Sequence, residues 1–478
     1  MLPLRFALPL RFALPLRIGL PLLLAVAGCA TYPAGFRAVL DPLRNGDPAA
    51  ALEQLDKSPK PDDVLYLEER GTLLRWCGRL AESSLSFESA EARAEDLYTY
   101  SVSREAAAIA TTDRLRPYRP STYERLLIRH YLMRNYLEQG DLEGAAVEAR
   151  RTVLLLDQLA DRGEPPEDRA NLLALATAGL VFEAAGEASD ALVCYRRIAN
   201  ATPLDRLPEG LAVWLAPHLR RLALDQGVPL SAIPGLEEPR REEQGGTVEP
   251  ASSPGATGEP SHFTAVLFFE RGYAPERTEM RLRLPILEAD DDDDDPWALA
   301  PALGERAAGI RSGSYSVPDG IKISYWLEVA LPSYASGAAN DEASAAARVG
   351  RSEVPIVFLE DVDARAKESL EREMPSIAGR AAARALIKYL AHQQAEKHVG
   401  EAGGILANVL GVASEQAETR TWLTLPQEIG VAVVDLPTAF ETAAVRWSDA
   451  SGRDGEIEVP LVVVGGGRFG FGSHRSGL

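Results

Sequence analysis

The chain has 478 residues, 46% of them hydrophobic and 25% charged. This length is enough for two or three domains with hydrophobic cores, and the composition is ordinary for a globular protein. The formal net charge of −20 argues against a nucleic-acid partner, because phosphates require a basic surface. It also argues against broad adsorption to anionic lipid.

The chain begins with a segment typical of protein export. Three arginines precede a short apolar run at residues 18–27, and two small residues stand directly before Cys29. This order is typical of a signal peptide, and the apolar run is shorter than the roughly 20 residues of a transmembrane helix. We therefore predict a signal peptide at residues 1–28 and a lipid anchor of acyl chains on Cys29. An ordinary thiol after a secretory signal is the alternative.

The residue after the lipidated cysteine bears on location. Ala30 stands where an aspartate would favour retention in the inner membrane of many Gram-negative bacteria. We therefore expect the outer membrane, facing the periplasm, with the lipid anchor as the membrane contact. The other two cysteines, Cys77 and Cys194, are expected two helical hairpins apart, farther than a disulfide spans. We expect both to be buried free thiols.

The amino-terminal half, residues 29–234, is predicted to be an array of helical hairpins. A glycine that ends one helix is followed five residues later by a small residue that packs against it, as in tetratricopeptide repeats. The pairs are Gly46 with Ala51, Gly78 with Ser83, Gly140 with Ala145 and Gly186 with Ala191. An aromatic or apolar residue comes four positions later, although Ala149 fills that place weakly.

The spacing of these units is irregular. Residues 94–121 form an insertion, and residues 207–226 are predicted to be a closing helix. The concave surface of such an array would receive a peptide or a partner helix. The alternative is an irregular helical bundle without a groove.

Several segments carry a resemblance to a known family. They are residues 123–132, 140–141, 147–151, 178–183, 190–197 and 421–426. They resemble an uncharacterised family of bacterial envelope lipoproteins with tetratricopeptide-like amino-terminal halves. The resemblance implies a shared architecture and an envelope location, and it implies no activity.

Charged residues in the third hairpin are the candidate partner-binding residues. They are Glu124, Arg125, Glu148, Arg150 and Arg151. Charges at helical spacing commonly form a solvated face with weak ion pairs. Alternatively, Arg150 and Arg151 line the groove and grip a carboxylate or phosphate, which suits the guanidinium fork.

Residues 235–262 are predicted to be a disordered linker, since their Glu, Pro, Gly and Ser content cannot bury enough apolar surface. Beyond it, residues 263–478 read as an α+β domain with a mostly antiparallel or mixed sheet. Period-two patterns predict strands, at residues 263–270, 280–286, 321–329, 354–359, 419–425, 431–436, 440–447 and 456–464. Two helices are expected, at residues 362–372 and 376–398. The predicted fold class is therefore α + (α+β).

The second of those helices carries a basic stripe. Arg380, Arg384, Lys388 and His392 recur every four residues. Such a stripe would meet anionic headgroups or an acidic partner, or would pair with acidic residues of its own domain. The small apolar segment at residues 403–411 is either a lipid-dipping segment or a buried hairpin.

Recognisable catalytic and cofactor motifs are missing from the sequence. The acidic run at residues 290–295 lacks the spacing and the turn glycine of a calcium loop. The histidines are too scattered for zinc. A glycine pattern at residues 465–470 resembles a dinucleotide fingerprint, but too little chain follows for the helix that would bind the phosphates. We expect no metal and no cofactor.

These observations predict a non-catalytic adaptor of the cell envelope. The helical hairpins would bind an envelope protein, and the linker would raise the effective concentration of what the two domains hold. An envelope hydrolase with its site in the carboxy-terminal domain is one alternative. A structural subunit of a secretion or surface-polymer assembly is another. Partner identity and oligomeric state do not follow from the sequence.

Overall fold

The computed structural model describes residues 31–57, 63–99, 116–165, 168, 170–236, 262–287, 323–334, 344–399, 416–448 and 454–476. Four predictions fall outside these ranges wholly or in large part. They concern the lipidated Cys29, the linker, the acidic run at residues 290–295 and the apolar segment at residues 403–411. The structure therefore leaves these predictions untested.

The first half of the chain forms helices that pack against their sequence neighbours. They are α2 (Tyr32–Gly35), α3 (Arg37–Arg44), α4 (Pro48–Lys57), α5 (Val64–Trp76), α6 (Leu80–Thr99), α8 (Thr122–Glu138), α9 (Leu142–Asp161), α11 (Leu172–Ala184), α12 (Ala188–Ala201) and α13 (Glu209–Asp225). Two short 3₁₀ helices, Leu204–Arg206 and Leu230–Ala232, flank α13. Helix α13 confirms the predicted closing helix.

The four predicted turn glycines do end helices. Gly46, Gly78, Gly140 and Gly186 have φ angles of 79°, 73°, 76° and 78°. This left-handed conformation is available to glycine without a steric penalty and lets the chain reverse after a helix. The prediction of turns at these positions is confirmed.

A second glycine in two of the hairpins allows close packing. A Cβ atom on Gly179 of α11 would lie 2.2 Å from the Tyr195 ring of α12, and one on Gly71 of α5 would lie 2.5 Å from the Phe87 ring of α6. Each aromatic ring therefore lies directly over a helix backbone.

The third hairpin has the two residue sizes exchanged at the corresponding positions. Met133 of α8 occupies the position that corresponds to these glycines, and Ala149 of α9 occupies the position of the aromatic ring. Both side chains are fully buried. The large residue has moved to the opposite helix, which explains why Ala149 matched the pattern poorly.

The second half of the chain supplies three sheets. The five-stranded sheet has the order β10-β11-β1-β7-β6, in which β1 and β11 run parallel and the other neighbours run antiparallel. Its strands are β1 (Phe263–Arg271), β6 (Val357–Asp361), β7 (Glu428–Leu436), β10 (Val462–Val464) and β11 (Phe469–Arg475). An antiparallel four-stranded sheet contains β5 (Ser352–Pro355), β4 (Ser344–Val349), β8 (Thr442–Ser448) and β9 (Asp454–Pro460).

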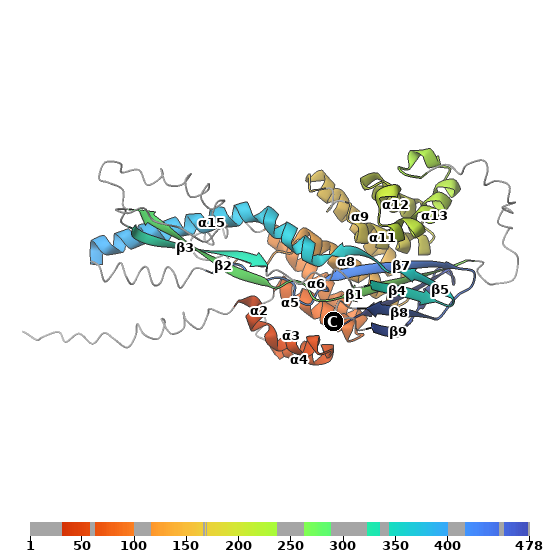
Figure 1. The fold of residues 1–478 in the computed structure, drawn as a ribbon, viewed down its shortest axis with the longest axis horizontal. Coiled ribbons are helices and arrows are strands. Elements are labelled where there is room, and N and C mark those ends of the chain that lie inside the picture. Colours follow the sequence, from red (N-terminus) through yellow and green to blue (C-terminus); the bar gives the residue numbers. More distant parts are fainter. Residues whose placement is uncertain are drawn as a thin grey trace, which may run out of the picture.

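The third sheet is a two-stranded hairpin of β2 (Arg277–Leu287) and β3 (Ile323–Tyr334). It lies along the long helix α15 (Val362–Val399), and together they project from the body as an arm (Figure 1). The two helices predicted here are one helix that continues through Pro375. None of the helices described is both long and apolar enough to cross a membrane. The helices and the mixed and antiparallel sheets confirm the α+β class.

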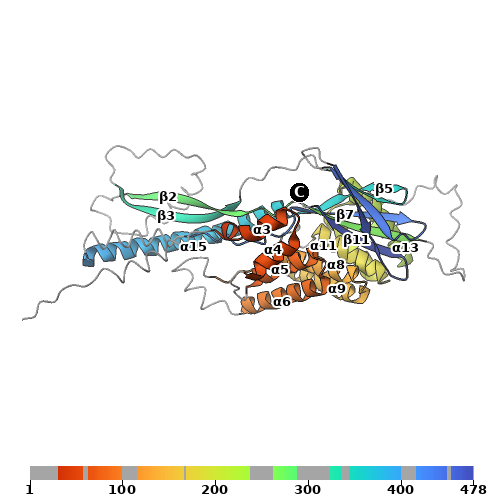
Figure 2. The same cartoon turned by 90° about the horizontal axis from the view of Figure 1, so that it is seen from below.

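The body has three layers (Figure 2). One face of the five-stranded sheet, including Val266 and Phe268, joins the core of the helical layer. The opposite face, including Ala265 and Leu267, packs on the four-stranded sheet. The helical half and the strands therefore share one hydrophobic core across the boundary at which two domains were predicted.

The segment predicted as a strand at residues 419–425 is instead embedded against the helices. Trp422 is fully buried, and its indole N–H donates to Thr72 Oγ1 at 3.0 Å. The backbone N–H groups of Leu423 and Thr424 donate to the Glu69 carboxylate at 2.8 and 2.9 Å. A buried side chain thus satisfies backbone donors that a strand ladder would otherwise have paired.

Smaller differences concern strand boundaries. The predicted strand at residues 354–359 is divided into β5 and β6, and the one at residues 456–464 is divided into β9 and β10. Strands β4 and β11 were not predicted, because their alanine- and glycine-rich sequences lack large β-branched side chains. The glycines after β10 form a left-handed turn into β11, and no helix follows them.

Candidate functional site

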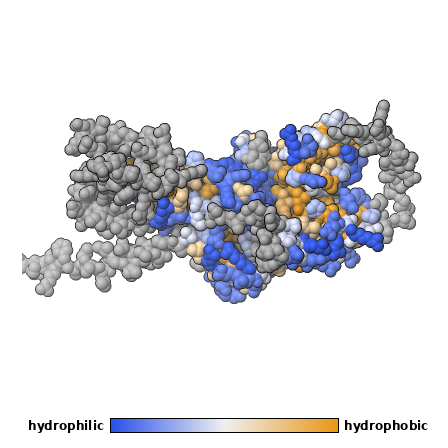
Figure 3. Space-filling model, viewed as in Figure 1, coloured by the Kyte–Doolittle hydropathy of each residue, from blue (hydrophilic) through white to orange (hydrophobic). Residues whose placement is uncertain are grey.

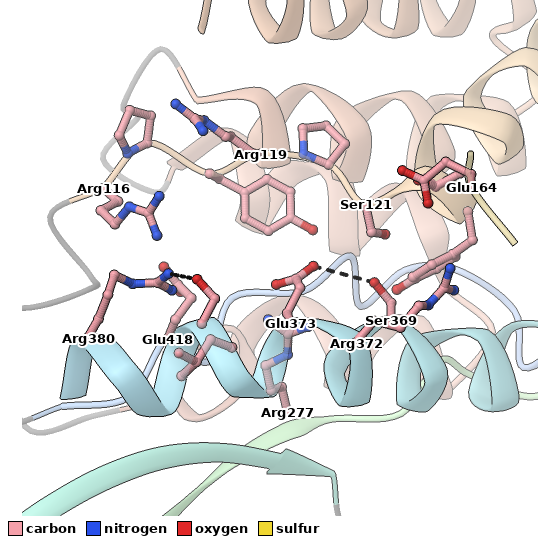
Figure 4. Close-up of a pocket in the computed structure, with 17 residues that line it drawn as sticks. Arg116, Arg119, Ser121, Glu164, Arg277, Ser369, Arg372, Glu373, Arg380 and Glu418 are labelled. Carbon is pink, nitrogen blue, oxygen red and sulfur yellow. Dashed lines mark hydrogen bonds between the residues drawn. The ribbon is translucent and has the colours of Figure 1, made fainter. Parts of the chain in front are cut away.

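A cleft of about 460 Å³ lies where the arm meets the helical layer (Figure 4). Residues 116–123 form one wall, α15 forms the opposite wall, and Arg277 of β2 and Glu418 complete the lining. The lining residues are Arg116, Pro117, Tyr118, Arg119, Pro120, Ser121, Thr122, Tyr123, Glu164, Arg277, Ser369, Arg372, Glu373, Ser376, Ile377, Arg380 and Glu418. Segments far apart in the sequence thus converge on one site.

The wall at residues 116–123 is held by the start of α8. Glu124 accepts a hydrogen bond from the backbone N–H of Ser121 at 2.7 Å, which is one half of a capping box, and a further one from the Ser121 hydroxyl at 2.8 Å. The Tyr118 hydroxyl donates to the other oxygen of Glu124 at 2.5 Å. Glu124 is buried, so this predicted partner-binding residue instead fixes the wall of the cleft.

Charged groups are distributed unevenly along the cleft, which is lined by five arginines and three glutamates. Arg116, Arg119 and Arg380 lie at one end with Glu418, while Glu164 lies at the other end (Figure 4). Glu418 accepts hydrogen bonds from the Arg420 Nε–H at 2.9 and 3.0 Å, which offsets much of its charge. At the other end, the Arg372 guanidinium interacts with Glu164 and pairs with the buried Asp168.

The middle of the cleft contains the carboxyl group of Glu373, which accepts a hydrogen bond. Burial raises the pKa of Glu373, and the guanidinium of Arg277 opposes that rise. Ser369 donates a hydrogen bond to Glu373 at 3.5 Å. Arg277 is itself oriented by the Tyr334 hydroxyl, which accepts from its Nε–H at 3.2 Å. The cleft therefore presents cationic and anionic groups in succession.

The predicted partner-binding residues of the third hairpin are not among those that line the cleft. Glu148 is buried and accepts from Arg129 at 2.7 Å and from Arg151 at 2.8 Å. Arg150 is exposed and pairs with Glu187 of the next hairpin at 2.7 Å. Arg150 and Arg151 therefore make ion pairs on the helical layer, at a distance from the cleft in the fold.

The basic stripe is not a continuous exposed surface. Arg384 is only 1% exposed and lies beside the core formed by α15 and β3, while Arg380 and Lys388 are partly buried. The exposed side of α15 instead carries Ile387 and Leu390. Arg384 therefore lies on the buried face of the helix and is not available to an outside partner.

None of the remaining predicted residues lines the cleft. Arg125 is partly buried on α8. Cys77 and Cys194 are free thiols, as predicted, although Cys77 is only half-buried. Within the described ranges, no three His, Cys, Asp or Glu side chains form a group that could hold a metal ion.

Comparison with protein-family models, with curated proteins and with solved structures gave no match. The cleft is therefore interpreted from its own residues. Sequence reasoning missed it, although Arg116-Pro117-Tyr118-Arg119-Pro120 is an unusual run within the predicted insertion. Two prolines stiffen that run, and two arginines lie on either side of an aromatic residue. This combination is the sequence signal from which a binding site could have been predicted.

Proposed function

We propose that the chain is a lipoprotein of the bacterial outer membrane, anchored through Cys29 and facing the periplasm, that acts as a non-catalytic scaffold for other envelope proteins. The anchoring is supported by the signal-peptide pattern with two small residues before Cys29 and by the resemblance to envelope lipoproteins. The left-handed turn glycines and the repeated packing between paired helices support a tetratricopeptide-like array.

The observation that carries the proposal is the position of Tyr32, three residues after Cys29. Its backbone N–H donates to Thr419 Oγ1 at 3.0 Å, and its ring stacks on Phe36 with 5.3 Å between centroids. Its hydroxyl donates to Glu69 at 3.4 Å. Three peptide units span at most about 11 Å, so a lipid on Cys29 would hold the folded body close to the membrane surface.

The body also offers surface for a partner. Leu154 of α9 is 56% exposed, and Val213 and Leu224 of α13 are 66% and 61% exposed. Figure 3 shows hydrophobic residues gathered on one side of the body, away from the arm. Gathered apolar surface commonly marks protein–protein contact sites. A body held at the membrane and presenting such a surface suits a scaffold.

The test combines mass spectrometry with crosslinking in cells. Acylation of Cys29 is read from the amino-terminal peptide of the purified protein. A photoreactive residue is placed at Leu154, with a matched one at Ile457 on the four-stranded sheet as the control. A reproducible envelope protein captured from Leu154 only would support the scaffold. No capture by a folded, acylated protein would refute a stable partner on this face.

A second candidate function, an envelope hydrolase, would use Glu373, which lines the cleft, accepts a hydrogen bond from Ser369 at 3.5 Å and has a raised pKa. A carboxyl group with a raised pKa is a common feature of general acids. Complementation of a deletion strain separates the two candidates. A scaffold would tolerate Glu373→Gln at equal protein level, whereas an enzyme that uses Glu373 as its acid would lose its function.

A further inference from the structure

Helix α13 has the place of the first helix in a further hairpin. It lies beside α12 at the end of the helical layer away from the arm (Figure 1). A left-handed glycine follows it, since Gly227 has a φ angle of 67° like the turn glycines of the preceding hairpins. The Val228 N–H donates to the Ala223 carbonyl at 2.8 Å, as the Glu187 N–H donates to the Phe182 carbonyl at the end of α11. The end of α13 is therefore built like the turn between α11 and α12.

No second helix comparable to α12 follows this turn in the described part of the chain. Between Gly227 and Leu236 there is only the short 3₁₀ helix Leu230–Ala232. Residues 237–261 contain several prolines and glycines and one valine. Such a composition suits neither a stable helix nor the burial of apolar surface. The sequence that follows α13 is therefore unsuited to serve as its second helix.

One face of α13 is consequently exposed. Four residues that recur at intervals of four, three and four share this face, and they are Val213, Pro217, Arg220 and Leu224. Val213 and Leu224 are 66% and 61% exposed, Pro217 is exposed, and Arg220 is partly buried. Counted back from the turn glycine, the same positions in three preceding hairpins are buried, apart from Leu172, which is partly buried. They are Val64, Glu68, Gly71 and Arg75 in α5, Leu126, His130, Met133 and Leu137 in α8, and Leu172, Ala176, Gly179 and Glu183 in α11.

The position seven residues before the turn glycine indicates what would fit this face. In α11 it is Gly179, which lies under the Tyr195 ring of α12. In the third hairpin, Met133 of α8 and Ala149 of α9 hold the corresponding positions. One position is small and the other is large in both cases, as close packing between two helices requires. In α13 the position is occupied by the large Arg220, so a helix packed on this face would carry a small residue opposite it.

The face is apolar, although the terminal helix of a repeat array usually keeps a polar outer side. The charged groups around it do not define a ligand. Arg221 pairs with Glu183, and Arg220 also interacts within the fold. Glu209 and Asp225 are exposed at the two ends of the helix. Apolar contact, and not charge, would therefore select the partner.

A second copy of the chain fits this face poorly. A symmetric pair brings the same surface patch of both copies together. Because Arg220 lies near the centre of the face, two α13 helices would oppose one large side chain with another. This arrangement lacks the combination of a large and a small residue that the hairpins use.

We propose that α13 binds an amphipathic helix of another envelope protein, which takes the place of the second helix of the last hairpin. The proposal rests on the scaffold function proposed above and names the class of partner. The partner helix has a small residue opposite Arg220 and apolar residues against Val213 and Leu224. These two residues are eleven positions apart, which corresponds to about 16 Å along a helix. The partner helix therefore has at least three turns.

Photocrosslinking in cells, with the crosslinked sites mapped by mass spectrometry, tests the proposal on the full-length protein. A photoreactive residue replaces Val213 in one strain and Leu224 in another. The matched control position is Leu85 of α6, which is 63% exposed. We expect both α13 positions to capture one segment of the same protein, at sites about eleven residues apart, with apolar residues every three or four positions. Capture of separate segments, or of a segment without this period, would refute the proposal.

Aspartate substitutions test whether the apolar face causes the capture. The photoreactive residue is placed at Pro217, and Val213→Asp is combined with Leu224→Asp. Capture should fall at least about tenfold, because each aspartate would lose its hydration in the contact. Leu85→Asp, at a similarly exposed site on α6, should leave the capture unchanged, and all variants should melt like the wild type because the replaced side chains are exposed. Unchanged capture by the double variant would overturn the proposal.

The other outcomes distinguish the occupants and the two proposals. Capture of residues 237–261, or of α13 from a second copy, would overturn the assignment to another protein. Absent capture from both Val213 and Leu224 in a folded protein would refute this inference. If Leu154 still captures an envelope protein in that case, the scaffold function stands without it. Failure at all three positions would refute both proposals.

Discussion

Replacement of Glu270 by glutamine should strongly destabilise the protein. Glu270 is 1% exposed and lies on β1 where the sheet meets the helical layer. It accepts a hydrogen bond from Arg134 of α8, and its Oε2 lies 3.3 Å from the Arg475 Nη1 atom of β11. Arg75 adds a third guanidinium to this buried cluster. The neutral amide would leave these guanidiniums without their central carboxylate.

The expected loss in the free energy of unfolding is about 3–5 kcal/mol, which is typical when one partner of a buried ion pair is removed. The matched control is Glu456→Gln, which breaks exposed pairs with Arg348 and Arg446. Such exposed surface pairs contribute little to stability. Urea denaturation followed by circular dichroism compares the two variants with the wild type. An equal, small loss in both variants would refute the view that this cluster joins the layers.

The pH dependence of Glu270 provides an independent check. Burial alone would raise the pKa of Glu270, but Arg134, Arg475 and Arg75 lower it below the ordinary value of a glutamate. The carboxylate therefore stabilises the fold above the unfolded pKa, and this stabilisation is lost as the pH falls through the folded pKa. The stabilities of the wild type and of Glu270→Gln should converge in acid. A constant difference across the acid range would contradict this assignment.

Three other predictions concern separate parts of the body. Burial alone would lower the pKa of His218, but hydrogen bonds to Asp435 and Glu183 raise it to about 9. On the order of 3 kcal/mol of stability should therefore be lost as the pH rises from about 6.5 to 9. His218→Gln should flatten that loss in urea titrations. Gly179→Ala should cost about 1–3 kcal/mol of stability by overpacking against Tyr195. A smaller side chain in place of Tyr195 should restore part of that loss in thermal melts. Cys194 is fully buried, its pKa is raised to about 12, and it should react with a maleimide only after unfolding. The half-buried Cys77 should react in the folded protein.

The helical half was largely predictable from sequence because its signals are local. Each turn glycine and its small partner lie five residues apart, and the 3.6-residue period of apolar residues marks the helices between them. The cleft was not predictable in this way. Its lining comes from residues 116–123, from Glu164, from β2, from α15 and from Glu418, and only the tertiary fold brings these segments together.

The carboxy-terminal half shows a second reason why some elements could not be predicted from sequence. Strand β1 was predicted from its apolar, partly β-branched sequence, whereas β11 contains alternating phenylalanine and glycine. The glycine positions of β11 are required by its neighbours, since a Cβ atom on Gly470 would lie 2.5 Å from the Phe263 ring. A partner across the sheet thus explains a residue choice that local propensity disfavours.

The parallel pairing of β1 with β11 has a consequence for the timing of folding. The strand at the centre of the five-stranded sheet can be flanked on both sides only after Phe469–Arg475 has been synthesised. The hydrophobic core of the helical layer is also incomplete until Trp422 has been synthesised. A chain synthesised from its amino terminus therefore reaches its stable form only when β11 is complete. A shorter, incomplete chain would leave part of this core exposed to proteolysis and aggregation.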